Sequence, residues 1–178
     1  MNTLPVLKPN SLIVLIAPHA ARDEASRLAA ELALHGPLTV LDGGNRFQPY
    51  RITRLLRQRR VDIITVSRRL FIRRAFTCYQ MLALLENTPA LRQPYLILDL
   101  LAGFYDEQVK DTQAHRLLER CLEQVLRLGQ LAPVVISLAP APSPERSFLV
   151  ERVCNRADQV LTPELPHPQV SQPVLFTS

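Results

Sequence analysis

The sequence predicts an α/β fold, a three-layer α/β/α sandwich around a mostly parallel central sheet. Short apolar runs alternate along the chain with amphipathic stretches, the pattern of strands covered by helices. The runs are continuously apolar rather than alternating, as expected for parallel strands that are buried on both faces. The predicted strands are residues 12–17, 38–41, 61–66, 95–100 and 134–138, with weaker ones at 159–161 and 174–176.

Amphipathic helices are predicted between these strands. Residues 25–32 carry an apolar stripe at helical spacing and are followed by Gly36 and Pro37, in the order typical of a helix C-terminus. A second stripe covers residues 117–128 and ends at Gly129. Each stripe predicts one face of a helix packed on the sheet.

A third helix has a clear start. Thr77 and Gln80 have the spacing of a capping box, in which the two side chains satisfy backbone N–H groups at the helix N-terminus. Phe76 and Met81 stand at the two positions of a hydrophobic staple. The pattern predicts a helix over residues 78–86.

Length and composition indicate one domain, residues 1–178. The apolar runs are far shorter than the roughly 20 residues that cross a bilayer, and the N-terminus lacks the pattern of a signal peptide. We therefore expect a soluble, cytoplasmic protein. The three cysteines are far apart and the four histidines have no metal-ligand spacing, so we expect no disulfide framework, no bound metal and no hydrolase site.

Two proline-rich segments lie near the end of the chain. Residues 139–144 leave the carboxyl end of a predicted strand, which is the edge where ligands bind in open α/β sheets. They form either part of a binding site or a stiff connector. Residues 163–173 are expected to link the last strands as an extended segment.

Three short motifs follow one another along the chain. Residues 42–52 read D-G-G-N-R-F-Q-P-Y-R-I, residues 74–82 read R-A-F-T-C-Y-Q-M-L, and residues 96–99 read L-I-L-D. In order and spacing they resemble the D-T-E-G-x-F-R-P-E-R-[IL] segment, the R-A-F/Y-[NT]-x-x-x-Q-[ML] segment and the Walker B strand of the RecA-like recombinases of archaea and eukaryotes, the RadA type. The second motif is one residue shorter here. The resemblance covers about residues 12–161 and implies a RecA-like core, with residues 162–178 as an extension or last strand.

Two departures from that pattern argue against ATP hydrolysis. A phosphate-binding loop needs glycines, so that backbone N–H groups wrap the phosphates, and a lysine. The turn after the first strand reads A-P-H-A-A-R-D-E, and the only lysines, Lys8 and Lys110, lie elsewhere. Its two acidic residues would lie at the helix N-terminus, where an anion would bind. Gly44 stands where the family has its water-activating glutamate, so we expect no catalytic residue and no cofactor.

Arg22, Asp42 and Asp99 mark the vestigial nucleotide site that the resemblance implies. Arg22 either replaces the charge of the missing lysine or is an exposed arginine at a helix start. Asp99 either holds a magnesium ion through water or pairs with a neighbour at the end of a buried strand. The sequence leaves both alternatives open.

The positive charge of the chain is concentrated in one segment. Residues 46–74 contain ten arginines and one acidic residue, Asp62, a formal charge of +9 in a chain of +5 overall. Such segregation favours a polyanionic partner, because each phosphate that is neutralised releases counterions. The candidate binding residues are Arg51, Arg54 and Arg57 on a predicted helix, and Arg68, Arg69, Arg73 and Arg74 after the predicted third strand.

Other interpretations of the arginines remain. They form a solvated face, or they pair with acidic residues such as Asp106, Glu107, Asp111 and Glu119. An acidic protein is a further possible partner. Aromatic residues near the segment are few, so extensive base stacking is not indicated.

The leading hypothesis is a non-catalytic RecA-like recombinase paralogue in DNA recombination and repair. It would bind DNA, or a catalytically active RecA-family protein, through the arginine-rich surface. Two alternatives remain open: a nucleotide sensor with an altered pocket around Arg22, Asp42 and Asp99, and a purely structural subunit of a protein complex.

Overall fold

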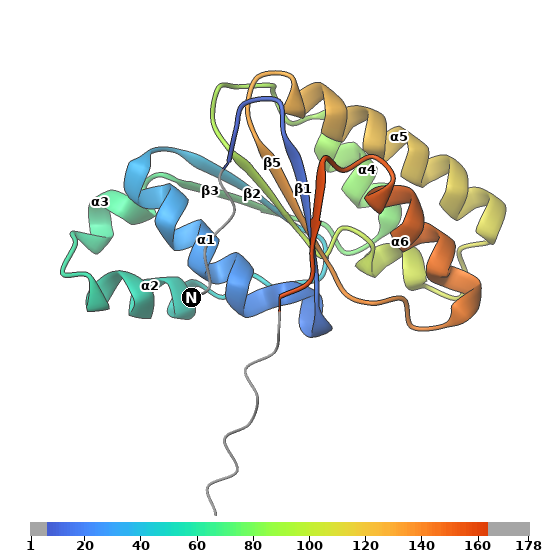
Figure 1. Ribbon diagram of the computed structural model, residues 1–178, viewed down its shortest axis with the longest axis horizontal. Helices are drawn as coiled ribbons and strands as arrows, with labels where there is room; N and C mark the ends of the chain where they lie inside the picture. The colour runs from blue at the N-terminus through green and yellow to red at the C-terminus, as the bar shows by residue number, and fades with distance from the viewer. Residues whose placement is uncertain (1–6, 164–178) are drawn as a thin grey trace, which may run out of the picture.

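The sheet of the protein has six strands, all parallel, in the order β3-β2-β4-β5-β1-β6. The computed structural model describes residues 7–163 (Figure 1). The strands are β1 (Leu12–Ile16), β2 (Leu38–Asp42), β3 (Leu70–Arg74), β4 (Tyr95–Leu98), β5 (Val134–Leu138) and β6 (Gln159–Leu161). The predicted parallel α/β sheet is confirmed, whereas the strand predicted at 174–176 lies outside the described residues.

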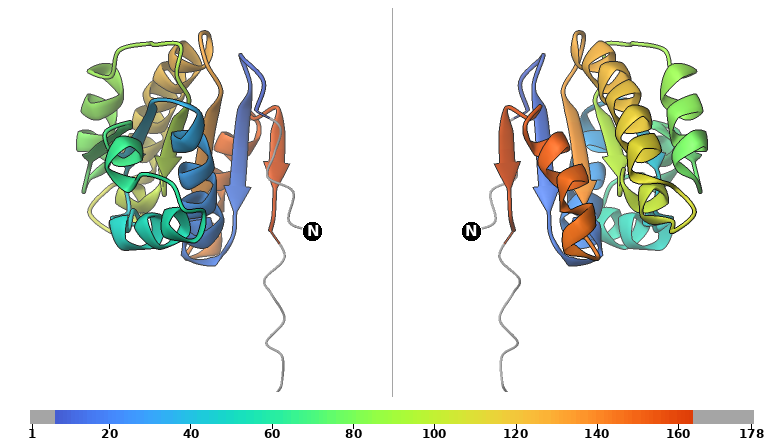
Figure 2. Two further views of the ribbon diagram at one scale, coloured as in Figure 1. Left: turned by 90° about the vertical axis from the view of Figure 1, so that its left-hand side faces the viewer. Right: turned by 90° about the vertical axis from the view of Figure 1, so that its right-hand side faces the viewer.

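Helices cover both faces of the sheet. One layer holds α1 (Arg22–His35), α2 (Pro49–Gln58) and α3 (Ile63–Ser67), and the opposite layer holds α4 (Cys78–Glu86), α5 (Asp111–Gly129) and α6 (Ser147–Cys154) (Figures 1 and 2). Three short 3₁₀ turns complete the described elements: η1 (Pro18–Ala21), η2 (Ala102–Tyr105) and η3 (Pro144–Arg146). The three predicted layers are confirmed. No described helix is both long and apolar enough to cross a membrane.

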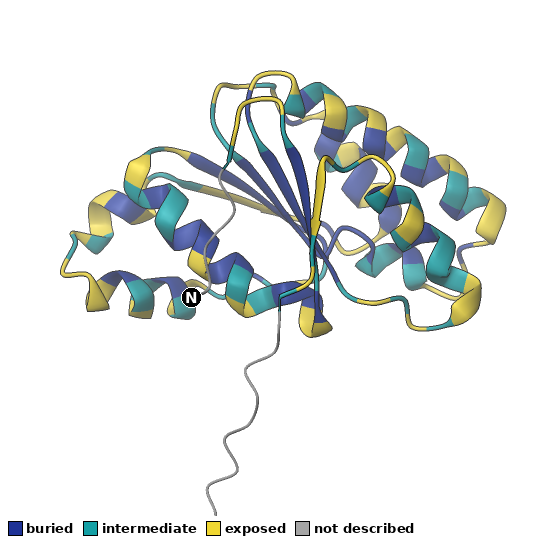
Figure 3. Ribbon diagram, in the orientation of Figure 1, coloured by how far each residue is buried: buried dark blue, intermediate teal, exposed yellow. Residues whose placement is uncertain are grey.

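The core is divided by the sheet into two apolar clusters. Neighbouring residues of one strand enter opposite clusters: Val14 packs among α4, α5 and α6, and Ile13 packs among α1, α2 and α3. The four central strands are almost entirely buried (Figure 3). The edge strands β3 and β6 are largely exposed. Burial on both faces explains why the central strands read as unbroken apolar runs.

The predicted third strand is wrong. Residues 63–66 of the predicted strand lie in helix α3. The strand that pairs with this edge of β2 is β3, which begins at Leu70. Asp62 caps α3: its Oδ1 accepts from the Ile64 N–H at 3.0 Å, and its Oδ2 accepts from the Thr65 hydroxyl at 2.6 Å. Both hydrogen bonds lower the pKa of the Asp62 carboxyl group, and the bond with Thr65 has the larger effect. The cap outweighed the strand preference of the apolar run, and β3 was missed because an edge strand carries polar residues.

Helix α4 begins as predicted. The Gln80 N–H donates to Thr77 Oγ1 at 3.1 Å, which satisfies one N-terminal backbone group. The Gln80 side chain reaches back to the Phe76 N–H at 2.8 Å, one residue before the position a capping box uses. Phe76 is 68% exposed while Met81 is buried, so the predicted staple covers little of the Phe76 ring.

Candidate functional site

Three charged residues stand in a row at the carboxyl edge of the sheet. Asp42 ends β2 and is paired in register with Arg74, which ends β3. On the other side Asp42 is paired with Leu98 of β4, and Asp99 follows directly. The structure therefore brings Asp42 and Asp99 together. This edge is where ligands bind in open α/β sheets.

Arg46 joins the two aspartates. Its backbone N–H donates to Asp42 Oδ1, and its Nε donates to Asp99 Oδ2, both at 2.8 Å. The other Asp42 oxygen accepts from the Phe47 N–H at 2.9 Å and lies 3.5 Å from Arg74 Nε. We call Asp42, Arg46, Arg74 and Asp99 the carboxyl-edge cluster. Its arginines neutralise the carboxylates, which are 0% and 2% exposed.

Arg46 is a site residue that the sequence analysis did not single out. Its role depends on the loop after β2, which turns back so that residue 46 lies over Asp99. The sequence offered one indication, an arginine four residues after a strand-ending aspartate. Of the two alternatives for Asp99, the structure shows the pairing with a neighbour: the positive charge beside its carboxylate is that of Arg46.

Gly44 contacts the same aspartate. A Cβ at residue 44 would lie 2.3 Å from Asp99 Oδ2, and a Cβ at residue 43 would lie 2.8 Å from the Asp99 carbonyl oxygen. A glutamate at residue 44 therefore does not fit while Asp99 holds its present position. Asp99 itself has φ 49°, a left-handed conformation that costs a non-glycine residue about 1–2 kcal/mol. Its N–H donates to Ser137 Oγ at 3.1 Å.

Tyr105 carries a buried hydroxyl near this cluster. The hydroxyl has no hydrogen-bond partner within residues 7–163. Burial, together with the negative charge of Asp99, raises the pKa of Tyr105 to about 12. The phenol is therefore neutral at physiological pH and is a poor proton acceptor.

The turn between β1 and α1 lies at the carboxyl edge of the sheet, where the resemblance would place a phosphate-binding loop. The connection that leaves β1 leads to α1 on one face, whereas the connection that leaves the adjacent β5 leads to α6 on the other. Ligands bind where neighbouring connections diverge in this way. Here the Ala17 N–H donates to the Leu138 carbonyl at 3.2 Å, and Ala20 and Ala21 are 0% and 1% exposed.

The backbone of that turn is left-handed at three successive residues. His19, Ala20 and Ala21 have φ values of 55°, 55° and 49°. Glycine adopts this conformation without cost, but none of the three is glycine. Ala20 and Ala21 therefore bury their methyl groups in a conformation that glycine adopts more readily.

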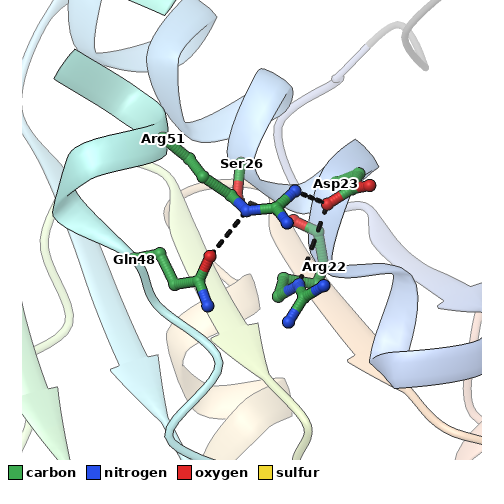
Figure 4. Close-up of polar contacts among 5 residues, drawn as sticks. All are labelled: Arg22, Asp23, Ser26, Gln48 and Arg51. Atoms are coloured by element: carbon green, nitrogen blue, oxygen red, sulfur yellow. Dashed lines mark hydrogen bonds and ion pairs between the residues drawn. The ribbon is translucent and has the colours of Figure 1, made fainter. Parts of the chain in front are cut away.

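Arg22 does not join Asp42 and Asp99. Its Nε lies 3.7 Å from Asp23 Oδ1 and is buried without a hydrogen-bond partner in the described part of the chain (Figure 4). Asp23 in turn pairs with Arg51 of α2, whose Nε also donates to Gln48 Oε1 at 2.6 Å. The three residues predicted for the vestigial site are thus divided between two places.

Five of the ten arginines between residues 46 and 74 are used within the fold. Arg46 and Arg74 belong to the carboxyl-edge cluster, and Arg51 pairs with Asp23. Arg59 pairs with Glu31 of α1. Arg69 donates to the carbonyls of Ala33 and Leu34 at the C-terminal end of α1, at 3.1 and 2.7 Å. Arg51 and Arg59 thus join α2 to α1, and Arg69 joins the segment before β3 to the end of α1.

The other five arginines are exposed and have no ion pair or hydrogen bond with any described residue. We call them the free arginines: Arg54, Arg57, Arg60, Arg68 and Arg73. Arg54 and Arg57 are on α2, Arg60 follows α2, and Arg68 follows α3. Arg73 is on β3, where it alternates with Ile72 and so points to the opposite face of the sheet.

Two details differ from the sequence analysis. Arg68 and Arg69 precede β3, and Arg73 and Arg74 lie in it, because the strand was expected earlier in the chain. None of the four expected acidic residues forms an ion pair with the segment in the described chain. Asp111 pairs instead with Arg146, and Glu119 pairs with Arg152 and Arg156. The acidic residues that do pair with the segment are Asp23, Glu31, Asp42 and Asp99.

Large apolar side chains are exposed on the edge strand β3 and on the segment that follows it. Phe71 and Ile72 of β3 are 54% and 39% exposed, and Tyr79 in the first turn of α4 is 49% exposed. Phe76, between β3 and α4, is the most exposed of the group. β3 pairs only with β2, so its other edge is unpaired in the described structure.

Comparison with known proteins adds no relative. No protein-family model matches the sequence, and no curated protein matches it. What the structure shows of the fold is a parallel α/β sheet flanked by helices.

Proposed function

We propose that the protein is a non-catalytic RecA-like subunit that binds DNA through its free arginines, in DNA recombination or repair. The observation that carries this proposal is the division of the arginines. Five are used inside the fold, and five are exposed with their charges uncompensated by any described residue. The uncompensated charges are available to a polyanion.

The absence of catalysis is supported by the carboxyl-edge cluster and the β1–α1 turn. A nucleotide with its magnesium ion would need the Asp99 carboxylate, which Arg46 already neutralises at 2.8 Å. The turn offers no lysine, and its methyl groups at Ala20 and Ala21 are buried. Gly44 supplies no general base. Each of these features removes one requirement of phosphoryl transfer.

The choice of DNA is supported by the placement of the free arginines. Four of them lie along α2 and at the ends of α2 and α3, on one layer of the molecule: Arg54, Arg57, Arg60 and Arg68. Arginine binds phosphate with paired N–H groups and is weakly hydrated, so it suits a backbone of phosphates. Exposed arginines on one layer, without carboxylate partners among the described residues, therefore favour phosphates.

Titration with labelled DNA at several salt concentrations tests the proposal. If about four phosphates are contacted, the log–log slope of affinity against salt is near −3.6 for duplex DNA, or near −2.8 for a single strand. Binding that does not weaken with salt, or no binding of either form at 50 mM salt, contradicts the proposal.

Calorimetry with ATP, ADP and magnesium tests the non-catalytic part. We expect no saturable binding, because Arg46 compensates the Asp99 charge and the turn after β1 has two buried alanines and no lysine. Saturable binding would favour the nucleotide-sensor alternative instead. The two titrations are independent, so DNA binding and loss of nucleotide binding are tested separately.

A second candidate partner is an active RecA-family protein. The exposed Phe71, Ile72, Phe76 and Tyr79 favour it, because aromatic residues and arginine are enriched at protein interfaces. The unpaired edge of β3 adds backbone groups that another chain can bind. The resemblance implies relatives that assemble head to tail, so a degenerate subunit would cap or regulate an assembly. Co-purification of a stoichiometric protein from nuclease-treated native extract, abolished by Phe71→Ser, would support this candidate.

A further inference from the structure

A groove runs between α1 and α2, on the layer that carries most of the free arginines. Its volume is about 470 Å³, and its lining is mostly polar, with side chains from the first two turns of α1 and from α2. Those that matter here are Arg27 on α1 and Tyr50, Arg51 and Arg54 on α2. Figure 4 shows the contacts of Arg51, which bridge the two helices beside the groove.

The groove carries two uncompensated positive charges. Three arginines line it against one carboxylate, that of Asp23, which already pairs with Arg51. Arg27 and Arg54 are exposed and form no ion pair or hydrogen bond with residues 7–163. They come from different helices, so a ligand in the groove meets one guanidinium on each side.

Tyr50 adds an aromatic surface to these charges. Its side chain lines the groove and is 73% exposed, more than any other large apolar or aromatic residue of the described chain. It lies in the first turn of α2, directly after Pro49, which fixes the helix start. A solvent-exposed ring in the same groove as two unpaired arginines is a combination that suits a base and its flanking phosphates.

We propose that this groove binds one nucleotide of single-stranded DNA, with the base stacked on Tyr50 and the flanking phosphates on Arg27 and Arg54. The proposal rests on the proposed DNA binding and specifies its form. In a duplex both faces of each base are covered by its neighbours, so Tyr50 has no ring to stack on. The groove has the size of small-molecule pockets, about 300–1,000 Å³, which suits a nucleotide and is too small for a double helix.

Fluorescence anisotropy with labelled oligo(dT) and with a duplex of equal length tests the proposal. Tyr50→Ala should weaken oligo(dT) binding about 5-fold to 150-fold, because stacking is worth about 1–3 kcal/mol per base. Tyr50→Phe keeps the ring and should bind as the wild type does. Duplex binding should be the same in all three proteins.

The arginines are tested by the double variant Arg27→Gln, Arg54→Gln. It should weaken oligo(dT) binding and reduce the magnitude of the salt slope by about 1.4, which is two single-strand phosphates. Arg92→Gln and Arg116→Gln, exposed arginines outside the groove, serve as controls and should change neither quantity. All the replaced side chains are exposed, so thermal unfolding should show that each variant folds as the wild type does.

The outcomes separate the two proposals. Oligo(dT) binding that is unchanged in Tyr50→Ala, or lost equally for duplex and single strand, overturns the groove while the proposed DNA binding stands. Absence of binding to both probes in the wild type overturns the proposed function, and the groove with it. A specific loss of oligo(dT) binding in Tyr50→Ala, restored by Tyr50→Phe, supports both.

Discussion

The carboxyl-edge cluster and the free arginines use the same residue type in opposite ways. Arg46 and Arg74 stand beside carboxylates that are almost fully buried, at the place where the resemblance would put a nucleotide. Arg54 and Arg57, only a few residues away in the chain, face solvent without a partner among the described residues. The difference shows that net charge alone does not locate a binding surface. Only charges that the fold leaves uncompensated are available to a ligand.

The energetic consequences of the two arrangements also differ. Removing the positively charged partner of a buried carboxylate lowers the free energy of unfolding by about 3–5 kcal/mol. An exposed arginine contributes little to stability, within about 0.5 kcal/mol. Replacing an arginine in each group therefore gives a direct comparison between a structural and a functional role.

The largest effect is expected for Arg46→Ala. It removes the partner of Asp99, which is 2% exposed, and should lower the free energy of unfolding by about 3 kcal/mol in urea denaturation. Arg57→Ala is the matched control and should change it by less than about 0.5 kcal/mol. Adding Asp99→Asn to Arg46→Ala should restore part of the loss, because the uncompensated charge is then absent. Equal effects of Arg46→Ala and Arg57→Ala would refute the division into two groups.

A smaller effect is expected for Gly44→Ala. The new Cβ would lie 2.3 Å from Asp99 Oδ2, so the carboxylate must move away from Arg46, and we expect a loss of about 2 kcal/mol. Gly36→Ala is the control, since nothing lies within 4 Å of its added Cβ and its φ of 168° suits any residue. Thermal unfolding of both variants measures the difference. If Gly44→Ala left the stability unchanged, the carboxyl-edge cluster would have room for a larger side chain.

The smallest effect concerns two tyrosine hydroxyls. The Tyr105 hydroxyl is buried without a partner in the described structure, so Tyr105→Phe should raise the free energy of unfolding by about 1 kcal/mol. The Tyr95 hydroxyl accepts from the Leu91 N–H at 2.6 Å and donates to the Pro89 carbonyl at 2.7 Å. Tyr95→Phe should therefore lower the same quantity by about 1–2 kcal/mol. Changes of the same sign in the two variants would contradict this assignment.

The pH dependence of Tyr105 follows from the same burial. Its pKa is raised from 10.0 to about 12, so the folded state keeps the proton after the unfolded chain has lost it. The ionisation of Tyr105 therefore leaves the free energy of unfolding unchanged below about pH 10 and lowers it as the pH rises toward 12, because the unfolded chain loses the proton first. Unfolding measured across this range should show a steeper decline for the wild type than for Tyr105→Phe.

Much of the fold was predictable because local patterns and tertiary structure agree. The buried strands read as apolar runs, and Thr77 with Gln80 marked the start of α4. The third strand was misplaced because apolarity and β-branching at 61–66 compete with a single hydrogen-bonding side chain, Asp62, which starts a helix. The edge strand β3 carries Arg73 and Arg74, so it lacks the apolar run that identifies a buried strand.

The candidate site was predictable only in part. The resemblance implied that Asp42 and Asp99 belong to one site, and they lie together because one ends β2 and the other directly follows the neighbouring strand β4. Arg46 and Arg22 could not be assigned in this way, because loop geometry decides which carboxylate a long side chain reaches. The pairing of Arg59 with Glu31 and the contact of Arg69 with the end of α1 likewise depend on helix packing. Sequence gives the number of arginines, whereas the three-dimensional structure shows which of them are free.

The most direct test of this account is the salt dependence of oligo(dT) binding in variants of the free arginines. For the double variant Arg57→Gln, Arg60→Gln, we predict a salt slope about 1.4 smaller in magnitude than that of the wild type. For the control pair Arg92→Gln, Arg116→Gln, exposed at another part of the chain, we predict the wild-type slope. A slope that falls equally in both pairs, or in neither, would contradict the claim that the arginines left unpaired around α2 and α3 bind DNA.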